Sequence, residues 1–102
     1  MRDTPLSGSE LRAIDDVAAL PSGLPPAVIA MWHLARGDWE HAHALAQDVR
    51  TPDGAWVHAH LHRVEGDEGN AAYWYARAGR PVSQVALDDE WVAITTALLA
   101  RE

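Results

Sequence analysis

The chain has 102 residues, a formal net charge of -7, 48% hydrophobic residues and no cysteine. This size suits one compact domain with its own core, and the missing cysteines exclude disulfides, thiolate metal ligands and a cysteine nucleophile. The negative charge argues against a nucleic-acid partner, because phosphate recognition needs clustered basic residues. The N-terminal stretch has no hydrophobic segment typical of a secretory signal, and the apolar runs fall short of the ~20 residues of a membrane span, so we expect a cytoplasmic protein.

Apolar spacing and helix-end signals predict an all-α fold without strands. Ser7 and Glu10 form a capping-box pattern, and Thr51 followed by Pro52 is typical of a helix start. Asp38, Asp67 and Asp88 are further candidate N-caps, and glycines 23, 37, 66 and 79 mark helix ends. The expected helices span about 8–20, 25–36, 38–50, 52–65, 68–79 and 88–101.

A Gly-Asp dipeptide at positions 37–38 recurs at 66–67, a shift of 29 residues. Several matches at one shift predict two helix–turn–helix units, 24–52 and 53–81. Small residues at matched positions would allow the two helices of each unit to approach closely. The matching pairs are Val28 and Val57, Ala30 and Ala59, His33 and His62, Ala42 and Ala71, and Pro52 and Pro81.

The stretches "GDWEHAHALAQDV" and "GDEGNAAYWYARAG" resemble the turn and second helix of tetratricopeptide and Sel1-like repeats. This resemblance covers about 24–81 and implies a right-handed array of antiparallel helix pairs. Helices 8–20 and 88–101 would then cap the array, after a flexible N-terminus at 1–7. The stretch "HRVEGDEGNAAYWYARAG" also resembles a signature of small bacterial proteins that carries no assigned activity.

In repeats of this type the first helix of each unit lines a concave groove, and the resemblance places Trp56, His60 and Arg63 there. Such a stripe would stack on a peptide and pair with its carboxylate. The alternative is that Trp56 packs under a capping helix while Arg63 is solvated. Tyr73 and Arg77 should point outward and mark a binding or self-association surface. We therefore expect a protein-interaction or scaffold module with a protein or peptide partner, no catalysis and no cofactor, and a homo-oligomer remains open.

The histidines suggest an alternative, a small metal- or histidine-dependent enzyme. His58 and His62 are one helical turn apart, with Glu65 three residues further on, and these residue types can bind zinc. His41 and His43 of the preceding helix could add ligands. A packing role is the favoured interpretation, because His62 repeats the position of an earlier histidine, so no metal is expected.

Polar residues also gather around the second Gly-Asp turn. We expect His62, Glu65, Asp67 and Asn70 to form a structural polar cluster, joined by Arg77 from the next helix. An acid–base role for this set is the alternative. The structural role is favoured, because the sequence places no nucleophile beside it.

Overall fold

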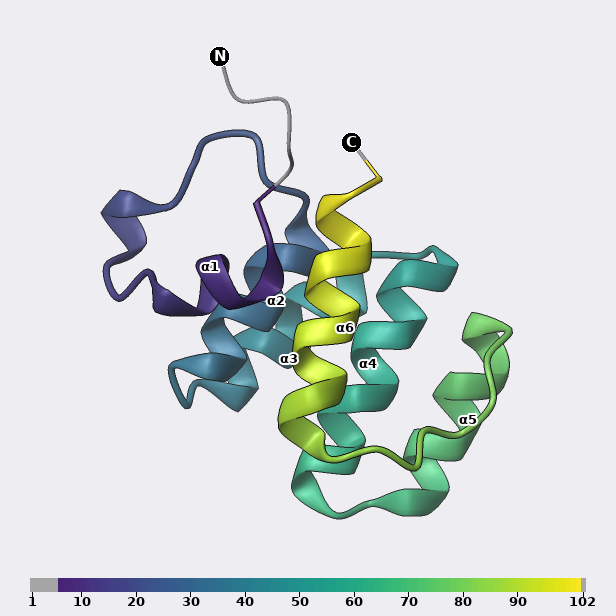
Figure 1. The fold of residues 1–102 in the computed structure, drawn as a ribbon. Helices are drawn as coiled ribbons and strands as arrows, with labels where there is room; N and C mark the ends of the chain where they lie inside the picture. The colour runs from purple at the N-terminus through teal and green to yellow at the C-terminus, as the bar shows by residue number, and fades with distance from the viewer. Residues whose placement is uncertain (1–5, 102) are drawn as a thin grey trace.

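The computed structural model describes residues 6–101, in which all regular structure is helical, and this confirms the predicted all-α class (Figure 1). Most of the segment predicted to be flexible, 1–7, lies outside the described residues. Within the described part, no helix has both the length and the apolar character needed to cross a membrane. The helices are α1 (Gly8–Ala13), the short 3-10 helix η1 (Val17–Ala19), α2 (Pro26–Ala35), α3 (Trp39–Asp48), α4 (Pro52–Glu65), α5 (Glu68–Ala78) and α6 (Leu87–Leu99).

Two helix hairpins, α2–α3 and α4–α5, have the same turn. Gly37 and Gly66 both adopt a φ of 86°, a conformation that glycine tolerates and that lets the chain reverse after a helix. The next residue in each case, Asp38 or Asp67, caps the following helix through its side chain. The alanines at positions 30, 42, 59 and 71 are all fully buried or nearly so, as expected for helices that approach closely.

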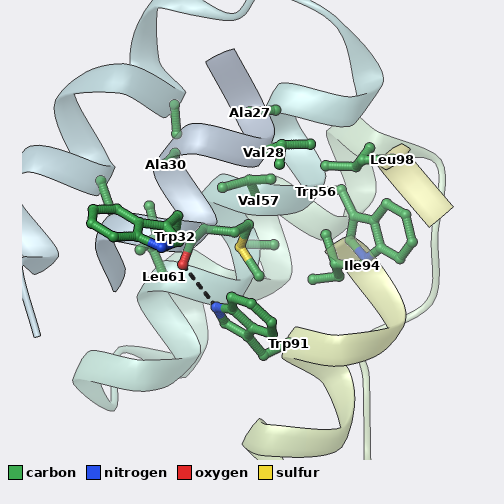
Figure 2. Close-up of a cluster of buried hydrophobic side chains, with 14 of the residues drawn as sticks. Ala27, Val28, Ala30, Trp32, Trp56, Val57, Leu61, Trp91, Ile94 and Leu98 are labelled. Atoms are coloured by element: carbon green, nitrogen blue, oxygen red, sulfur yellow. Dashed lines mark hydrogen bonds between the residues drawn. The ribbon is translucent and has the colours of Figure 1, made fainter. Parts of the chain in front are cut away.

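Helix α6 closes the core by packing against α1, α2 and α4 (Figure 1). Its residues Trp91, Ile94 and Leu98 lie among apolar side chains of α2 and α4 (Figure 2). The Trp91 indole Nε1–H donates to the Met31 carbonyl oxygen at 2.8 Å, so this large ring is buried with its polar atom satisfied. Helix α6 therefore completes the hydrophobic core.

The predicted helix 8–20 is wrong in its second half, because α1 ends at Ala13 and Ile14 is extended. Two carbonyls that would continue α1 accept side-chain hydrogen bonds instead, one from a residue of α2 and one from the residue that follows α2. Trp32 Nε1 donates to Ile14 O at 2.9 Å, and an Arg36 guanidinium nitrogen donates to Arg12 O at 2.7 Å. Tertiary bonds thus end the helix where local spacing favoured continuing it.

The expected N-cap at Asp88 is also wrong. Helix α6 begins at Leu87 after Ala86, which makes no side-chain cap. Asp88 lies in the first turn, where its negative charge interacts favourably with the positive end of the helix dipole. Its carboxylate also forms an ion pair with Arg12 at 2.9 Å. The acidic start of the helix therefore contributes through charge rather than through a capping hydrogen bond.

Candidate functional site

Three histidines from two helices meet on one side of α4. His58 and His62 lie one turn apart on α4, and His43 reaches them from α3. The ring centroids of His43 and His58 are 4.6 Å apart, those of His58 and His62 are 4.9 Å apart, and those of His43 and His62 are 5.5 Å apart. One ring nitrogen of each histidine lies within 4.8 Å of the other two, which is the spacing of a group that could hold a metal ion. We call these three residues the histidine cluster.

Two tryptophans stack on the histidine cluster and orient its rings. Trp74 of α5 stacks on His58 with centroids 3.8 Å apart, and Trp39 of α3 stacks on His43 with centroids 4.8 Å apart. Trp39 is itself anchored, because its Nε1–H donates to the Leu61 carbonyl oxygen at 2.8 Å. His58 and His62 are buried, whereas His43 is half-buried beneath Trp39.

Burial favours the neutral form of two histidines in the cluster, His43 and His58. Burial, reinforced by the neighbouring His43 and His62, lowers the pKa of His58 to about 4. Burial and the proximity of His62 also lower the pKa of His43. His62 Nδ1 forms a hydrogen bond with Glu65 Oε1 at 2.5 Å, and its Nε2 has no hydrogen-bond partner among residues 6–101. Neutral rings with free lone pairs are chemically suited to bind a metal ion.

Four residues of the expected structural polar cluster come together around the second turn, where ligand atoms of His62, Glu65 and Asp67 lie within 4.8 Å of one another. His62 pairs with Glu65, and Asp67 accepts from the backbone and side-chain amides of Asn70 at 3.2 and 3.3 Å. Glu65, Asp67 and Asn70 are exposed, so this cluster lies at the surface of the turn, and only His62 is buried. Arg77 does not join them and lies instead beside Tyr73, one turn earlier on α5.

A hollow of about 660 Å³ opens between α3, α4 and α5 beside the histidine cluster. Its walls combine aliphatic, aromatic and cationic side chains, and His58 forms part of them. This volume lies within the range of small-ligand sites, which is roughly 300–1,000 Å³. We call it the α3–α5 hollow, and among its lining residues are Val49, Arg50, Thr51, His58, Trp74 and Arg77.

Two arginines give the α3–α5 hollow a positive wall. Within residues 6–101, neither Arg50 nor Arg77 has a carboxylate at ion-pair distance. Arg77 packs its guanidinium over the rings of Tyr73 and Trp74 and donates to the Tyr73 hydroxyl oxygen at 3.3 Å. In an acidic chain, two unneutralised guanidinium groups at one opening favour an anionic ligand.

The other side of α4 carries a buried ionic network centred on Glu90 of α6. His60 Nδ1 lies 2.7 Å and Arg63 2.6 Å from Glu90 Oε1, and the Tyr75 hydroxyl donates to Glu90 Oε2. Burial alone raises the pKa of Glu90, but the hydrogen bonds from His60 and Tyr75 and the pairing with Arg63 outweigh it and hold the pKa below its usual value. Burial and the bond to Glu90 raise the pKa of Tyr75. Both oxygens of the carboxylate are occupied by internal donors, so we call this set the Glu90 network.

The stripe predicted to line an open groove lies beneath α6 instead. His60 is 1% exposed and Trp56 is 8% exposed, and Arg63 points toward Glu90 rather than a free carboxylate. The guanidinium carbon of Arg80 lies 3.4 Å from the ring centroid of Trp56 and covers that indole. The prediction that His60 and Arg63 line an open groove is therefore wrong. The burial of Trp56 agrees with the alternative in which this residue packs internally. Arg63 is not the solvated charge of that alternative either.

Sequence reasoning missed Glu90. A signal was present, because Glu90 lies four and eight residues before the buried Ile94 and Leu98, on the apolar stripe of α6. An acidic residue on such a stripe needs a buried partner. Sequence reasoning gave His43 only a secondary place, and the structure brings it fully into the histidine cluster.

Tyr73 and Arg77 point outward on α5, as predicted, with Tyr73 55% exposed. Their role in partner binding or self-association remains a prediction. Comparisons with protein-family models, with curated proteins and with solved structures found no match.

Proposed function

We propose that this chain is a binding module of the helical-repeat type, which captures an acidic peptide segment in the α3–α5 hollow. The predicted right-handed, tetratricopeptide-like arrangement of the hairpins is part of this proposal. Its support is the matched turn geometry of α2–α3 and α4–α5 and the burial of their small residues. Stacked hairpins of this kind commonly present a hollow between consecutive units.

The observation that carries the proposal is the pair of arginines, Arg50 and Arg77, that no described carboxylate neutralises. Guanidinium groups form short, charge-assisted hydrogen bonds with carboxylates, often through two nitrogens at once. Trp74 and Val49 add an apolar wall, and Thr51 adds a hydroxyl. A peptide that alternates acidic and apolar side chains matches this combination.

The test is fluorescence anisotropy with a labelled peptide of alternating glutamate and leucine, together with a lysine–leucine peptide of the same length. We expect saturable binding of the acidic peptide only, with an affinity that falls as salt rises. Arg50→Gln and Arg77→Gln should each weaken binding about tenfold, because one charge-assisted hydrogen bond contributes roughly 1.5–3 kcal/mol. The double substitution Arg50→Glu and Arg77→Glu should abolish it.

Arg80→Gln is the matched control, because Arg80 also lacks a described carboxylate partner but lies outside the α3–α5 hollow, over Trp56. It changes the net charge by the same amount as each test variant. Binding that is equally weakened by Arg80→Gln would show that only overall charge matters. No saturable binding by the folded protein would refute the proposal. Arg63→Glu is unsuitable as a test, because it disrupts the buried Glu90 network and with it the fold.

A further inference from the structure

We propose that His43, His58 and His62 bind a zinc ion through three imidazole nitrogens, with Glu65 as the carboxylate that orients His62. This proposal is independent of the proposed peptide function, although His58 also lines the α3–α5 hollow. Its ligands are imidazole rings on α3 and α4, and it requires neither Arg50 nor Arg77.

The geometry of the rings matches a tetrahedral metal site. Zinc binds imidazole nitrogen at about 2.0–2.1 Å, and tetrahedral coordination then places ligand ring centres about 5 Å apart. The three centroid separations of 4.6, 4.9 and 5.5 Å bracket that value. The nitrogens lie within 4.8 Å of one another, whereas ligands of one zinc ion need about 3.3 Å, so small ring rotations close the site.

The two helices that carry the three rings pack against each other. His58 and His62 occupy consecutive turns of one helix, which fixes their mutual spacing. His43 comes from α3, whose Trp39 is hydrogen-bonded to α4 at the Leu61 carbonyl. The metal would therefore join two helices that already pack together, with little ordering cost on binding.

Glu65 supplies the outer hydrogen bond that metal-binding histidines usually have. Its Oε1 accepts from His62 Nδ1 at 2.5 Å, which selects the tautomer with a free Nε2. A carboxylate in this position makes the imidazole a stronger ligand and holds its orientation. Neither His43 nor His58 has a hydrogen-bond partner within residues 6–101, so their ring nitrogens are uncommitted.

The chemistry of the ligands selects the ion. Three neutral imidazoles suit zinc and its first-row neighbours, whereas calcium and magnesium prefer oxygen ligands. With three protein ligands, a fourth position remains for water or another small ligand.

A second group, His33, Asp38 and His41, lies at the turn of the first hairpin. Its rings are stacked with centroids 3.8 Å apart, closer than two imidazoles bound to one tetrahedral ion. Asp38 is also the N-cap of α3. This group therefore serves as a comparison for the histidine cluster rather than as a second proposed site.

The experiment is a titration of tag-free, chelator-treated protein with cobalt(II), followed by its visible absorption and then by displacement with zinc. We expect one cobalt per chain, the intense bands of a four-coordinate site, and complete loss of these bands when one equivalent of zinc is added. Circular dichroism confirms that each protein sample is folded. A folded wild-type protein that binds no cobalt or zinc stoichiometrically would overturn the proposal.

Variants locate the ion. His43→Ala removes a half-buried ligand, and His58→Phe keeps a ring stacked on Trp74 while removing both nitrogens. Each should weaken metal binding by more than the about 10–100-fold loss expected for Glu65→Gln, which only removes the outer hydrogen-bond partner. His41→Ala is the matched control and should titrate like wild type. Unchanged binding in the folded His43→Ala protein, or binding lost in His41→Ala, would contradict the site.

The failure of this proposal is distinguishable from failure of the peptide proposal. Arg50→Gln should leave the cobalt titration unchanged, because Arg50 contacts none of the three ligand rings in any described interaction. His43→Ala should leave acidic-peptide anisotropy largely unchanged, because His43 does not line the α3–α5 hollow. Each titration therefore tests one site by itself.

Discussion

The two helix hairpins share one turn geometry but differ in the polarity of their inner faces. Asp38 N donates to His33 O at 3.0 Å in the first hairpin, and Asp67 N donates to His62 O at 2.9 Å in the second. At the same shift of 29 residues, apolar residues of the first hairpin become polar or aromatic in the second. The pairs are Ile29 and His58, Met31 and His60, Leu34 and Arg63, and Ala46 and Tyr75.

Helix α6 explains part of this difference. Toward the first hairpin it presents Trp91, whose indole bonds to Met31, so apolar neighbours are sufficient there. Toward the second hairpin it presents the carboxylate of Glu90, which requires donors. One backbone arrangement therefore carries either apolar packing or an ion network, according to the residue that faces it.

The largest effect expected from this comparison is that of Glu90→Gln. Loss of this charge leaves Arg63 and His60 without their buried partner, and breaking a buried ion pair from one side costs about 3–5 kcal/mol. Urea denaturation monitored by tryptophan fluorescence measures the free energy of unfolding. The exposed neighbour provides a matched control, because Asp89→Asn should change this free energy by less than about 1 kcal/mol. Equal values for the two variants would show that the Glu90 network contributes no more than a surface charge.

An intermediate effect is expected from acid on His58, the position that is isoleucine in the first hairpin. Burial lowers the pKa of His58 to about 4 in the folded protein, from 6.5 when unfolded. Protonation then favours the unfolded chain, so this contribution is complete above the unfolded pKa and is lost as pH falls from 6.5 toward 4. Linkage gives a loss of about 2 kcal/mol between about pH 7 and pH 5.

The groups facing His58 are His43 from α3, His62 from α4 and the ring of Trp74 from α5. Unfolding of wild type and His58→Phe should be compared in metal-free buffer at both pH values, because other groups also titrate in this interval. The phenylalanine variant should lose about 2 kcal/mol less than wild type on acidification. Identical pH dependence of the two proteins would mean that His58 is protonated as easily when folded as when unfolded.

Most of the fold was predictable because local signals and packing agree. Capping at Ser7, Thr51, Asp38 and Asp67, and the helix ends at Gly66 and Gly79, appear in the structure as the sequence indicated. The predicted helix 8–20 was too long because the side chains of Trp32 and Arg36 donate hydrogen bonds to carbonyls at the end of α1 and just beyond it. Residue spacing within the segment does not reveal these contacts. Tertiary contacts therefore decide the boundaries that propensity leaves free.

The candidate site was predictable only where its residues share one helix. The pairing of His58 with His62, and of His62 with Glu65, follows from helical spacing. The approach of His43 and the burial of Glu90 depend on how α3 and α6 dock on α4, which spacing within one helix does not contain. For this reason the sequence placed His60 and Arg63 in an open groove, whereas the docked α6 covers them.

The smallest expected effect tests the feature that the hairpins share. Asp38 Oδ1 accepts from His41 N at 3.1 Å, and Asp67 Oδ1 accepts from Asn70 N at 3.2 Å. Asp38→Ala and Asp67→Ala should therefore each lower the free energy of unfolding by about 1 kcal/mol, the usual cost of a lost N-cap. Urea denaturation of the two variants and their double variant measures this directly. A cost at one turn only would mean that equal backbone geometry does not give equal stability, and that the polar second hairpin depends on its turn differently from the apolar first.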